Sequence, residues 1–330
     1  MNFSTHMIEG WKRDTQTLIS KGMTADAYIC LSVADIAETS PKFLLPQGGD
    51  VGLSSITPEQ MKYARNPYPT TVFEYTAHPP KVLHEGATPS LRRVVTVMTP
   101  SAMLAVGDHA PVVKTYLEHF FAGAETLFSA PADNGLVMLC SYFADVSKFW
   151  VSPITAVYVP WSAFDHSGLA KPTARLLPLP LMTEALEAGA KLDGKSSQET
   201  CLMFAKESME DITIVLKALL CLNARNVKEV IVPAPDALNK KRKKFGKTPF
   251  FEYRVLDIFL GENLRKVASG NNKRARAGVE AWMKCANKLH AVRGHFKTRK
   301  TGIFWWSDFI RGSNAEGVIV KDYNLIGEAK

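Results

Sequence analysis

The sequence contains no long uninterrupted run of apolar residues. Its best candidate, residues 212–222, is interrupted by Lys217 and falls short of the roughly 18 residues that a membrane-spanning helix needs. The N-terminal residues also lack the apolar stretch that is typical of a secretory signal peptide. We therefore expect a protein of the cytoplasm that has no membrane partner.

Cysteine is scarce, and its positions follow no metal-binding pattern. The five cysteines include no Cys-x-x-Cys pair; they are Cys30, Cys140, Cys201, Cys221 and Cys285. Each lies in an apolar or helical context, which is typical of reduced thiols in a hydrophobic core. The sequence therefore predicts neither a disulfide framework nor a zinc site.

Recognisable catalytic motifs are absent as well. The chain has no Walker A loop, no Gly-x-Gly-x-x-Gly turn, no Gly-x-Ser-x-Gly elbow and no His-Glu-x-x-His pair. Its carboxylates are scattered, so their spacing does not assemble the metal site of a nuclease. These absences predict no cofactor and no metal, and they favour a binding protein over an enzyme.

Helix and strand patterns alternate along the first 235 residues. Helices are predicted over residues 2–21, 25–37 and 111–128, and a longer helix begins with the capping box of Ser196 and Glu199 and runs to about residue 223. Strands are predicted over residues 70–76, 91–98, 136–143, 155–159 and 227–232, the last as a core strand. Residues 170–182, with three prolines, indicate an irregular crossing. The patterns predict an α+β fold, a mixed sheet flanked by helices.

Positive charge is concentrated at the C-terminal end. Residues 236–330 contain 21 Lys and Arg against 9 Asp and Glu, whereas residues 1–235 contain 19 against 23. This asymmetry is typical of a neutral scaffold that carries a polyanion-binding surface, although a merely solubilising surface is the alternative. We therefore predict an α/β scaffold over residues 1–235, with a groove for a peptide or protein partner. A basic, aromatic, β-rich module is appended over residues 236–330.

The densest basic segment lies at the start of this module. Six cations fall within eight residues: Lys240, Lys241, Arg242, Lys243, Lys244 and Lys247. Such charges repel one another unless a polyanion compensates them, and phosphates with counterion release are the usual compensation. The segment predicts a flexible nucleic-acid-binding loop, and a solvated loop tip is the alternative.

A second segment, residues 290–306, interleaves cations with aromatic residues. Its candidate phosphate contacts are Arg293, His295, Lys297, Arg299 and Lys300, and its candidates for stacking on bases are Phe296, Phe304, Trp305 and Trp306. Thr301 and Gly302 predict the turn of a hairpin. In the returning strand Trp305 and Trp306 face opposite sides, so at least one set of aromatic residues must belong to a core. A packing role for both tryptophans remains an alternative.

His290 and His295 have no partner with metal-ligand spacing, so no metal site is predicted. Histidines near Arg and Lys can also act as acid and base in RNA cleavage, which makes this pair weak candidates for a metal-independent ribonuclease. Phosphate contact or a structural role is the more common use of such residues.

The motif His290-x-x-Arg293-Gly294-His295-Phe296, followed by a basic turn and a tryptophan-bearing strand, resembles the C-termini of a family of phage and plasmid proteins. That family includes the type V anti-CRISPR protein that blocks Cas12a production. The order of two further segments, residues 66–75 and the basic run before residues 249–253, agrees with it. The resemblance covers about the last ninety residues and this short N-terminal patch.

The resemblance implies a protein of a mobile genetic element that acts in a bacterial host on gene expression, in an anti-defence or host-takeover role. We expect a regulator that binds RNA or a ribosome–message complex, together with a nascent peptide or protein target, and lowers expression of that target. A metal-independent ribonuclease and a phage structural or DNA-maintenance protein are the alternatives. The resemblance does not extend to the Cas12a target itself.

Overall fold

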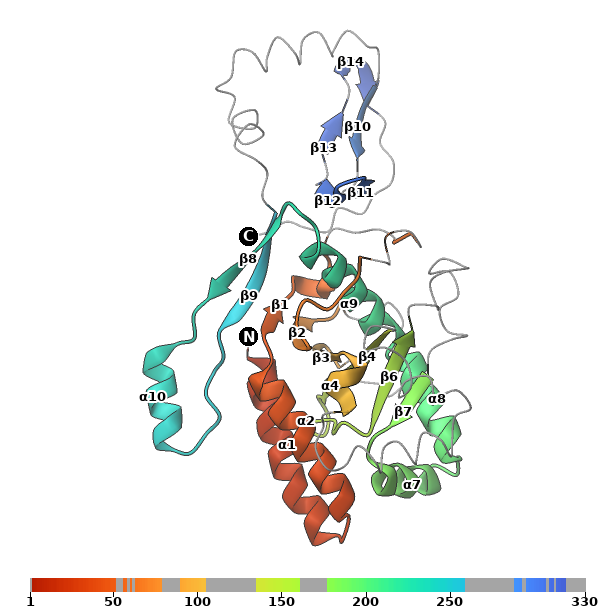
Figure 1. The fold of residues 1–330 in the computed structure, drawn as a ribbon, viewed down its shortest axis with the longest axis vertical. Coiled ribbons are helices and arrows are strands. Elements are labelled where there is room, and N and C mark those ends of the chain that lie inside the picture. The colour runs from red at the N-terminus through yellow and green to blue at the C-terminus, as the bar shows by residue number, and fades with distance from the viewer. Residues whose placement is uncertain are drawn as a thin grey trace. The chain divides into compact units, whose positions relative to one another are not determined.

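The computed structural model describes residues 2–51, 56–57, 60, 63–78, 90–104, 135–160, 177–258, 288–292, 295–306, 309–311 and 313–318 (Figure 1). The chain divides into two compact units. The first comprises Met1–Val51, Ile56–Asn223 and Glu229–Asp257, and the second comprises Gly52–Ser55, Ala224–Lys228 and Ile258–Lys330. The predicted boundary near residue 235 does not coincide with this division, because a helix and a strand beyond it belong to the first unit.

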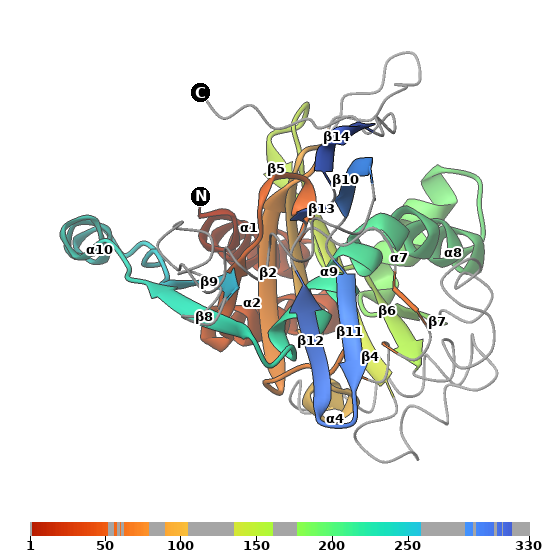
Figure 2. The same ribbon diagram turned by 90° about the horizontal axis from the view of Figure 1, so that it is seen from above.

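The first unit is built on a mixed sheet with the strand order β7-β6-β4-β3-β2-β1-β9-β8, and β5 pairs with β4. Figure 2 shows β8 and β9 at one end of this row and β7 at the other. Strand β1 pairs in parallel with β2 and β9, and the pairs from β2 through β7 are antiparallel. The strands are β1 Lys42–Leu44, β2 Thr70–Thr76, β3 Arg92–Met98, β4 Gly135–Ala144, β5 Phe149–Trp150, β6 Thr155–Pro160, β7 Leu177–Pro180, β8 Val227–Val232 and β9 Tyr253–Ile258.

Helices pack on both faces of the sheet. They are α1 Phe3–Ser20, α2 Thr24–Thr39, α4 Pro100–Leu104, α7 Thr183–Leu192, α8 Ser197–Glu207, α9 Met209–Leu222 and α10 Asp236–Lys244, with a short 3-10 turn η1 at Gln47–Gly49. Glu74 of β2 contacts α1, and the next residue, Tyr75, contacts α9. Because successive side chains of a strand point to opposite faces, α1 and α9 cover opposite faces. Among the described residues, no helix is long and apolar enough to cross a membrane.

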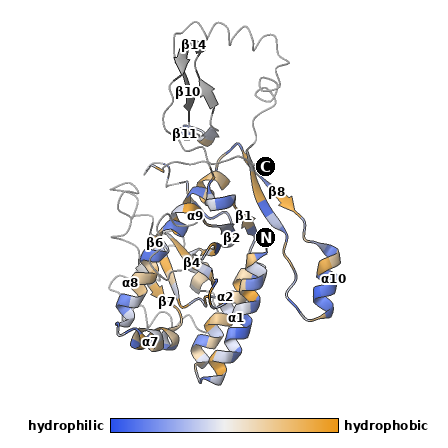
Figure 3. Cartoon of the chain, turned by 180° about the vertical axis from the view of Figure 1, so that it is seen from behind, coloured by the Kyte–Doolittle hydropathy of each residue, from blue (hydrophilic) through white to orange (hydrophobic). Residues whose placement is uncertain are grey.

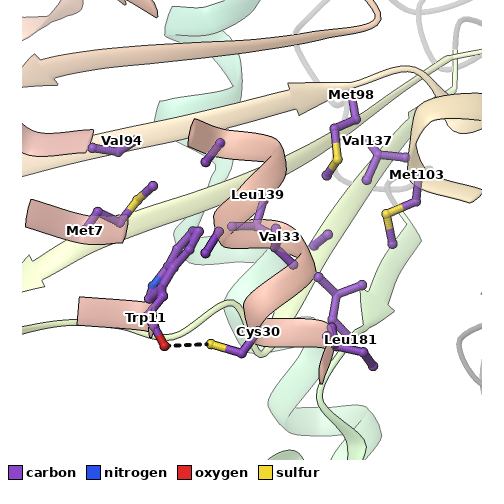
Figure 4. Packing of buried hydrophobic residues seen from close by; sticks show 14 of the residues in the cluster. Met7, Trp11, Cys30, Val33, Val94, Met98, Met103, Val137, Leu139 and Leu181 are labelled. Atoms are coloured by element: carbon purple, nitrogen blue, oxygen red, sulfur yellow. Dashed lines mark hydrogen bonds between the residues drawn. The ribbon is translucent and has the colours of Figure 1, made fainter. Parts of the chain in front are cut away.

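The core lies between α1, α2 and one face of the sheet. Figure 4 shows Met7 and Trp11 of α1 beside Val33 of α2 and Leu139 of β4, and all four are buried. The Cys30 thiol donates to the Trp11 carbonyl at 3.5 Å. Burying these apolar side chains supplies the main favourable term for folding. The α+β class and the helix-flanked mixed sheet predicted from the sequence are confirmed.

The predicted helix from Ser196 to residue 223 is two helices. Its capping box is present: Ser196 Oγ accepts from the Glu199 amide, and Glu199 accepts from the Ser196 amide. The helix breaks at Ser208, whose hydroxyl donates to the Phe204 carbonyl at 2.8 Å. Serine bonded to a carbonyl four residues earlier bends helices. The prediction of one continuous helix was therefore wrong.

Two end strands also differ from prediction. Part of the expected irregular crossing is β7, in which Pro178 and Pro180 stand opposite Val157 and Thr155. Proline lacks a ladder donor and is tolerated there because β7 ends the row of described strands. Strand β8, predicted as a core strand, ends the other side of the row, and its residue Ile231 is 56% exposed. The predicted helix over residues 111–128 lies outside the described residues.

The described part of the second unit consists mainly of strands. Strands β10 Lys288–Val292, β13 Phe309–Arg311 and β14 Ser313–Val318 form one small sheet in the order β13-β10-β14. Strands β11 His295–Arg299 and β12 Gly302–Trp306 form a separate antiparallel hairpin. The β-rich character predicted for the C-terminal module is confirmed for this part of the chain.

Candidate nucleic-acid interface

The basic segment predicted as a flexible loop is the helix α10. Asp236 lies in its first turn and four of its cations lie in its last turn, an arrangement that the helix dipole favours. The helix ends at Lys244 with Phe245 as its C-cap, and the next residue, Gly246, has a φ of 63° that suits glycine. The Gly246 amide donates to the Lys243 carbonyl at 3.1 Å, and the Lys247 amide donates to the Arg242 carbonyl at 3.0 Å. This pair of bonds is a Schellman motif, and it fixes where the helix stops.

Four lysines cover one side of α10. Each residue of a helix advances by about 100°, so Lys240, Lys241, Lys243 and Lys244 together cover an arc of about 160°. Arg242 points about 180° from the centre of that arc. All four lysines are exposed, and Figure 3 shows α10 as largely hydrophilic. We call these four residues the lysine face.

Arg242 anchors α10 to α1 within the first unit. Its guanidinium donates to Glu9 Oε1 of α1 at 2.6 Å and to the Thr248 carbonyl at 2.6 Å. The same group lies 4.3 Å from the centre of the Phe250 ring. Arg242 was predicted as a nucleic-acid contact together with its neighbours. The structure instead places its charge against a carboxylate, and the exposed lysines remain as the contact candidates.

A second contact holds α10 in place. Asn239 Nδ2 donates to the Phe250 carbonyl at 2.8 Å, and the Phe250 amide donates back to Asn239 Oδ1 at 2.7 Å. The Thr248 amide also donates to Glu9, at 3.2 Å. Because these bonds act on the side of the helix away from the lysine face, they orient that face toward solvent.

The lysine face has no acidic partner among the described residues. The ion pairs there join Arg242, Arg254, Arg92, Arg93, Lys12 and His6 to carboxylates, and none involves an α10 lysine or Lys247. Like charges one turn apart on a helix destabilise it by a few tenths of a kcal/mol per pair, ~0.2–0.5 kcal/mol. A bound polyanion would relieve this repulsion.

The β11–β12 hairpin carries a second basic surface. Arg299 pairs with Gly302, so the turn is Lys300-Thr301, one residue earlier than predicted. Strand alternation places Lys297, Arg299, Phe304 and Trp306 on one side, and we call this side the hairpin face. Lys297 Nζ lies 4.7 Å from the centre of the Trp306 ring, and the Arg299 guanidinium lies 5.8 Å from that of Phe304. These cation–π contacts hold the Lys297 and Arg299 charges over the aromatic rings of the hairpin face.

The opposite side of the hairpin is buried. Phe296 and Trp305 are 5% and 3% exposed, and their rings meet edge-on with centres 5.1 Å apart. A buried ring cannot stack on a base unless the hairpin opens. The four stacking candidates therefore narrow to Phe304 and Trp306, of which Trp306 is 40% exposed. The predicted division of the two tryptophans between opposite faces is confirmed.

Asn226 braces this hairpin from within the second unit. Its side chain donates to the Trp305 carbonyl at 2.6 Å and accepts from the Trp305 amide at 2.8 Å. The Arg225 amide donates to the Ile303 carbonyl at 3.1 Å. Asn226, like Glu9 and Asn239, was missed by sequence reasoning, since no local pattern links an asparagine to a strand 79 residues away.

The histidine motif is described only in its backbone. His290 lies in β10 opposite Arg311, and His295 opens β11 opposite Trp306, so the two belong to different sheets. Arg293 lies outside the described residues. Within the described ranges, no group of three or more His, Cys, Asp or Glu side chains could hold a metal ion.

Several titratable groups of the first unit are buried in its interior, among them Cys30, Cys201 and Glu74. Burial raises the pKa of the Cys30 thiol to about 12 and that of Cys201 to about 11, which leaves both thiols protonated and unreactive at neutral pH. Glu74 accepts from the Ser4 amide and hydroxyl and from Tyr253, and burial raises its pKa. The bonds of Glu74 thus join β2 to α1 and β9.

Comparisons of the chain with protein-family models, with curated proteins and with solved structures found no match. The lysine face and the hairpin face are therefore the features of the molecule that indicate a function.

Proposed function

We propose that this protein is an RNA-binding regulator, encoded by a phage or plasmid, that lowers expression of a target. The observation that carries the proposal is the lysine face of α10. Its four cations are exposed, lie on one arc and have no acidic partner among the described residues, while Arg242 and Asn239 hold the helix that bears them. Uncompensated cations at fixed positions on one surface are suited to bind the phosphates of a nucleic acid.

The hairpin face supports RNA as the ligand. It presents cations beside the aromatic rings of Phe304 and Trp306. Many proteins that bind single-stranded nucleic acids combine cations with aromatic residues in this way. In this proposal the nucleic acid is a message or a ribosome–message complex, and residues 1–235 recognise a protein or nascent peptide. The mobile-element origin and the effect on expression rest on the C-terminal resemblance.

Salt dependence tests the proposal directly. Purified protein is titrated with a fluorescent single-stranded RNA at several salt concentrations between about 50 and 300 mM, a roughly sixfold range over which counterion release changes the affinity measurably. The logarithm of the affinity should fall linearly with the logarithm of the salt concentration, by about 0.7 per phosphate contacted. Changing the lysine face to Gln should lower this slope by about 2–3.

A charge-matched control separates the surface from net charge. Lys21, Lys191, Lys195 and Lys206 are exposed lysines away from α10, and changing all four to Gln removes the same charge. This control should keep the salt slope, and in bacterial cells it should still repress a reporter of the target, whereas the lysine-face variant should not. Equal loss in both variants, or an affinity that does not depend on salt, would refute the proposal.

A further inference from the structure

Phe245 is an exposed aromatic residue placed among the α10 cations. The residue is 68% exposed, the largest value of any Phe, Tyr or Trp in the described ranges. Its ring takes part in no aromatic or cation–π contact with the described residues. By comparison, Phe304 and Trp306 of the hairpin face each lie beneath a cation of their own strand pair. The Phe245 ring is therefore open to a ligand.

The backbone around Phe245 is held in one conformation. Phe245 is the C-cap of α10, its amide donates to the Arg242 carbonyl at 2.9 Å, and the Schellman bonds of Gly246 and Lys247 close the helix directly after it. A backbone segment that is already held in one conformation loses little further entropy on binding. Phe245 is thus presented from a fixed point.

Three lysines neighbour Phe245 along the chain or on the helix surface. Lys241 lies four residues earlier and is its neighbour on the helix surface, and Lys244 and Lys247 flank it along the chain. All three are exposed and have no acidic partner among the residues described. A flat apolar surface bordered by cations suits a nucleotide, whose base is flat and whose phosphates are anionic. Single exposed apolar residues are common, so it is this setting that distinguishes Phe245.

We propose that Phe245 is a stacking platform for an unpaired base, and that Lys241, Lys244 and Lys247 bind the phosphates on either side of that base. This deepens the proposed function and rests on it: α10 would then discriminate single-stranded from double-stranded nucleic acid, because paired bases keep their faces stacked on one another. The hairpin face has its own aromatic residues, Phe304 and Trp306.

Variants of α10 test the role of the ring. Phe245→Ala should weaken binding of a single-stranded oligouridine about tenfold, the effect of losing one base–aromatic stack. Phe245→Trp should retain the affinity, because indole also stacks. Leu238→Ala is the matched control: Leu238 is an apolar residue of the same helix, 52% exposed, and its truncation should change affinity less than twofold.

The choice of ligand separates stacking from charge. An abasic oligomer of the same length carries the same phosphates and no bases, and its affinity should be equal for the wild type and Phe245→Ala. If both oligomers lose affinity equally, or if Phe245→Ala binds oligouridine as tightly as the wild type does, the platform is overturned while RNA binding stands. If the wild type binds neither oligomer, both the platform and the proposed function fail.

Discussion

Arg242 of α10 donates to Glu9 of α1 at 2.6 Å, across 233 residues of sequence. The charge of Arg242, in the middle of the basic run, is therefore compensated by Glu9. The lysine face on either side of it remains available to bind a partner. Both side chains are partly buried, with 14% and 29% of their surfaces exposed, so the pair is less screened than an ion pair in free solution.

This pair makes an unusual prediction about Glu9. Removing a negative charge ordinarily strengthens binding to a polyanion, yet Glu9→Gln should weaken single-stranded RNA binding about three- to tenfold, because α10 loses the contact that orients its lysine face. Denaturation with urea should show a loss of about 1–2 kcal/mol in the free energy of unfolding.

Glu210→Gln is a suitable control for Glu9, since Glu210 is exposed in the first turn of α9 and the change removes the same charge at another helix surface. Its RNA affinity should rise slightly or stay the same. Tighter binding by Glu9→Gln than by the wild type would show that α10 needs no positioning by α1.

Lys42 gives a prediction about pH. Burial lowers the pKa of its ammonium group to about 8, although Glu38, Glu74 and Glu252 raise it in part. Between pH 8 and its ordinary value of 10.5, the folded state has lost this proton and the unfolded state still binds it. The contribution of Lys42 to the free energy of unfolding therefore increases with pH across that window, by up to about 1.4 kcal/mol per pH unit.

Lys42→Met should remove this contribution. Urea unfolding of the wild type and the variant at several pH values measures the difference in the free energy of unfolding, and this difference isolates Lys42 from the other titratable groups. The variant also loses the two bonds that Lys42 donates to the Glu38 and Ser40 carbonyls, a loss that shifts its stability at every pH. Parallel pH profiles would show that Lys42 titrates normally.

Asn226 should control the opening of the hairpin. Asn226→Ala removes both bonds to the Trp305 backbone and leaves a Trp305 amide without its acceptor, which costs about 1–3 kcal/mol. Hydrogen exchange of the β11 and β12 amides should become at least tenfold faster, while exchange in β2 and β3 stays unchanged.

Asn239→Ala is the natural counterpart of Asn226→Ala, because it removes the same pair of backbone bonds at Phe250. It should accelerate exchange of the Phe250 amide and leave the hairpin protected. Unchanged hairpin exchange in Asn226→Ala would mean that other contacts hold the strands.

RNA should remain intact in the presence of the protein. His290 lies in β10 and His295 lies in β11, and these two strands belong to different sheets. Strand pairing therefore does not bring the two histidines together. Labelled RNA incubated with highly purified protein in EDTA should show no new fragments. Cleavage that disappears in both His290→Ala and His295→Ala would instead establish the metal-independent ribonuclease.

Much of the fold could be predicted because its signals are local. The capping box of Ser196 and Glu199 spans four residues, and the alternation in β12 needs only the order of Ile303 to Trp306. Strand β2 matches its predicted range because its β-branched and aromatic residues are contiguous. A local signal was insufficient at Ser208, where one continuous helix was predicted. There the hydroxyl donates to the Phe204 carbonyl, and the chain forms two helices.

The sequence by itself determined that cations gather near the C-terminal end and that Trp305 and Trp306 face opposite sides of a strand. Only the tertiary structure decided which of those groups face solvent. Arg242 and Lys243 are adjacent and chemically alike, but a carboxylate from α1 meets one and not the other. Phe296 and Phe304 are likewise residues of the same type in neighbouring strands, but Phe296 is buried and Phe304 is partly exposed. The reason is physical: exposure and charge pairing depend on residues brought together from distant parts of the chain, and no local spacing encodes those encounters.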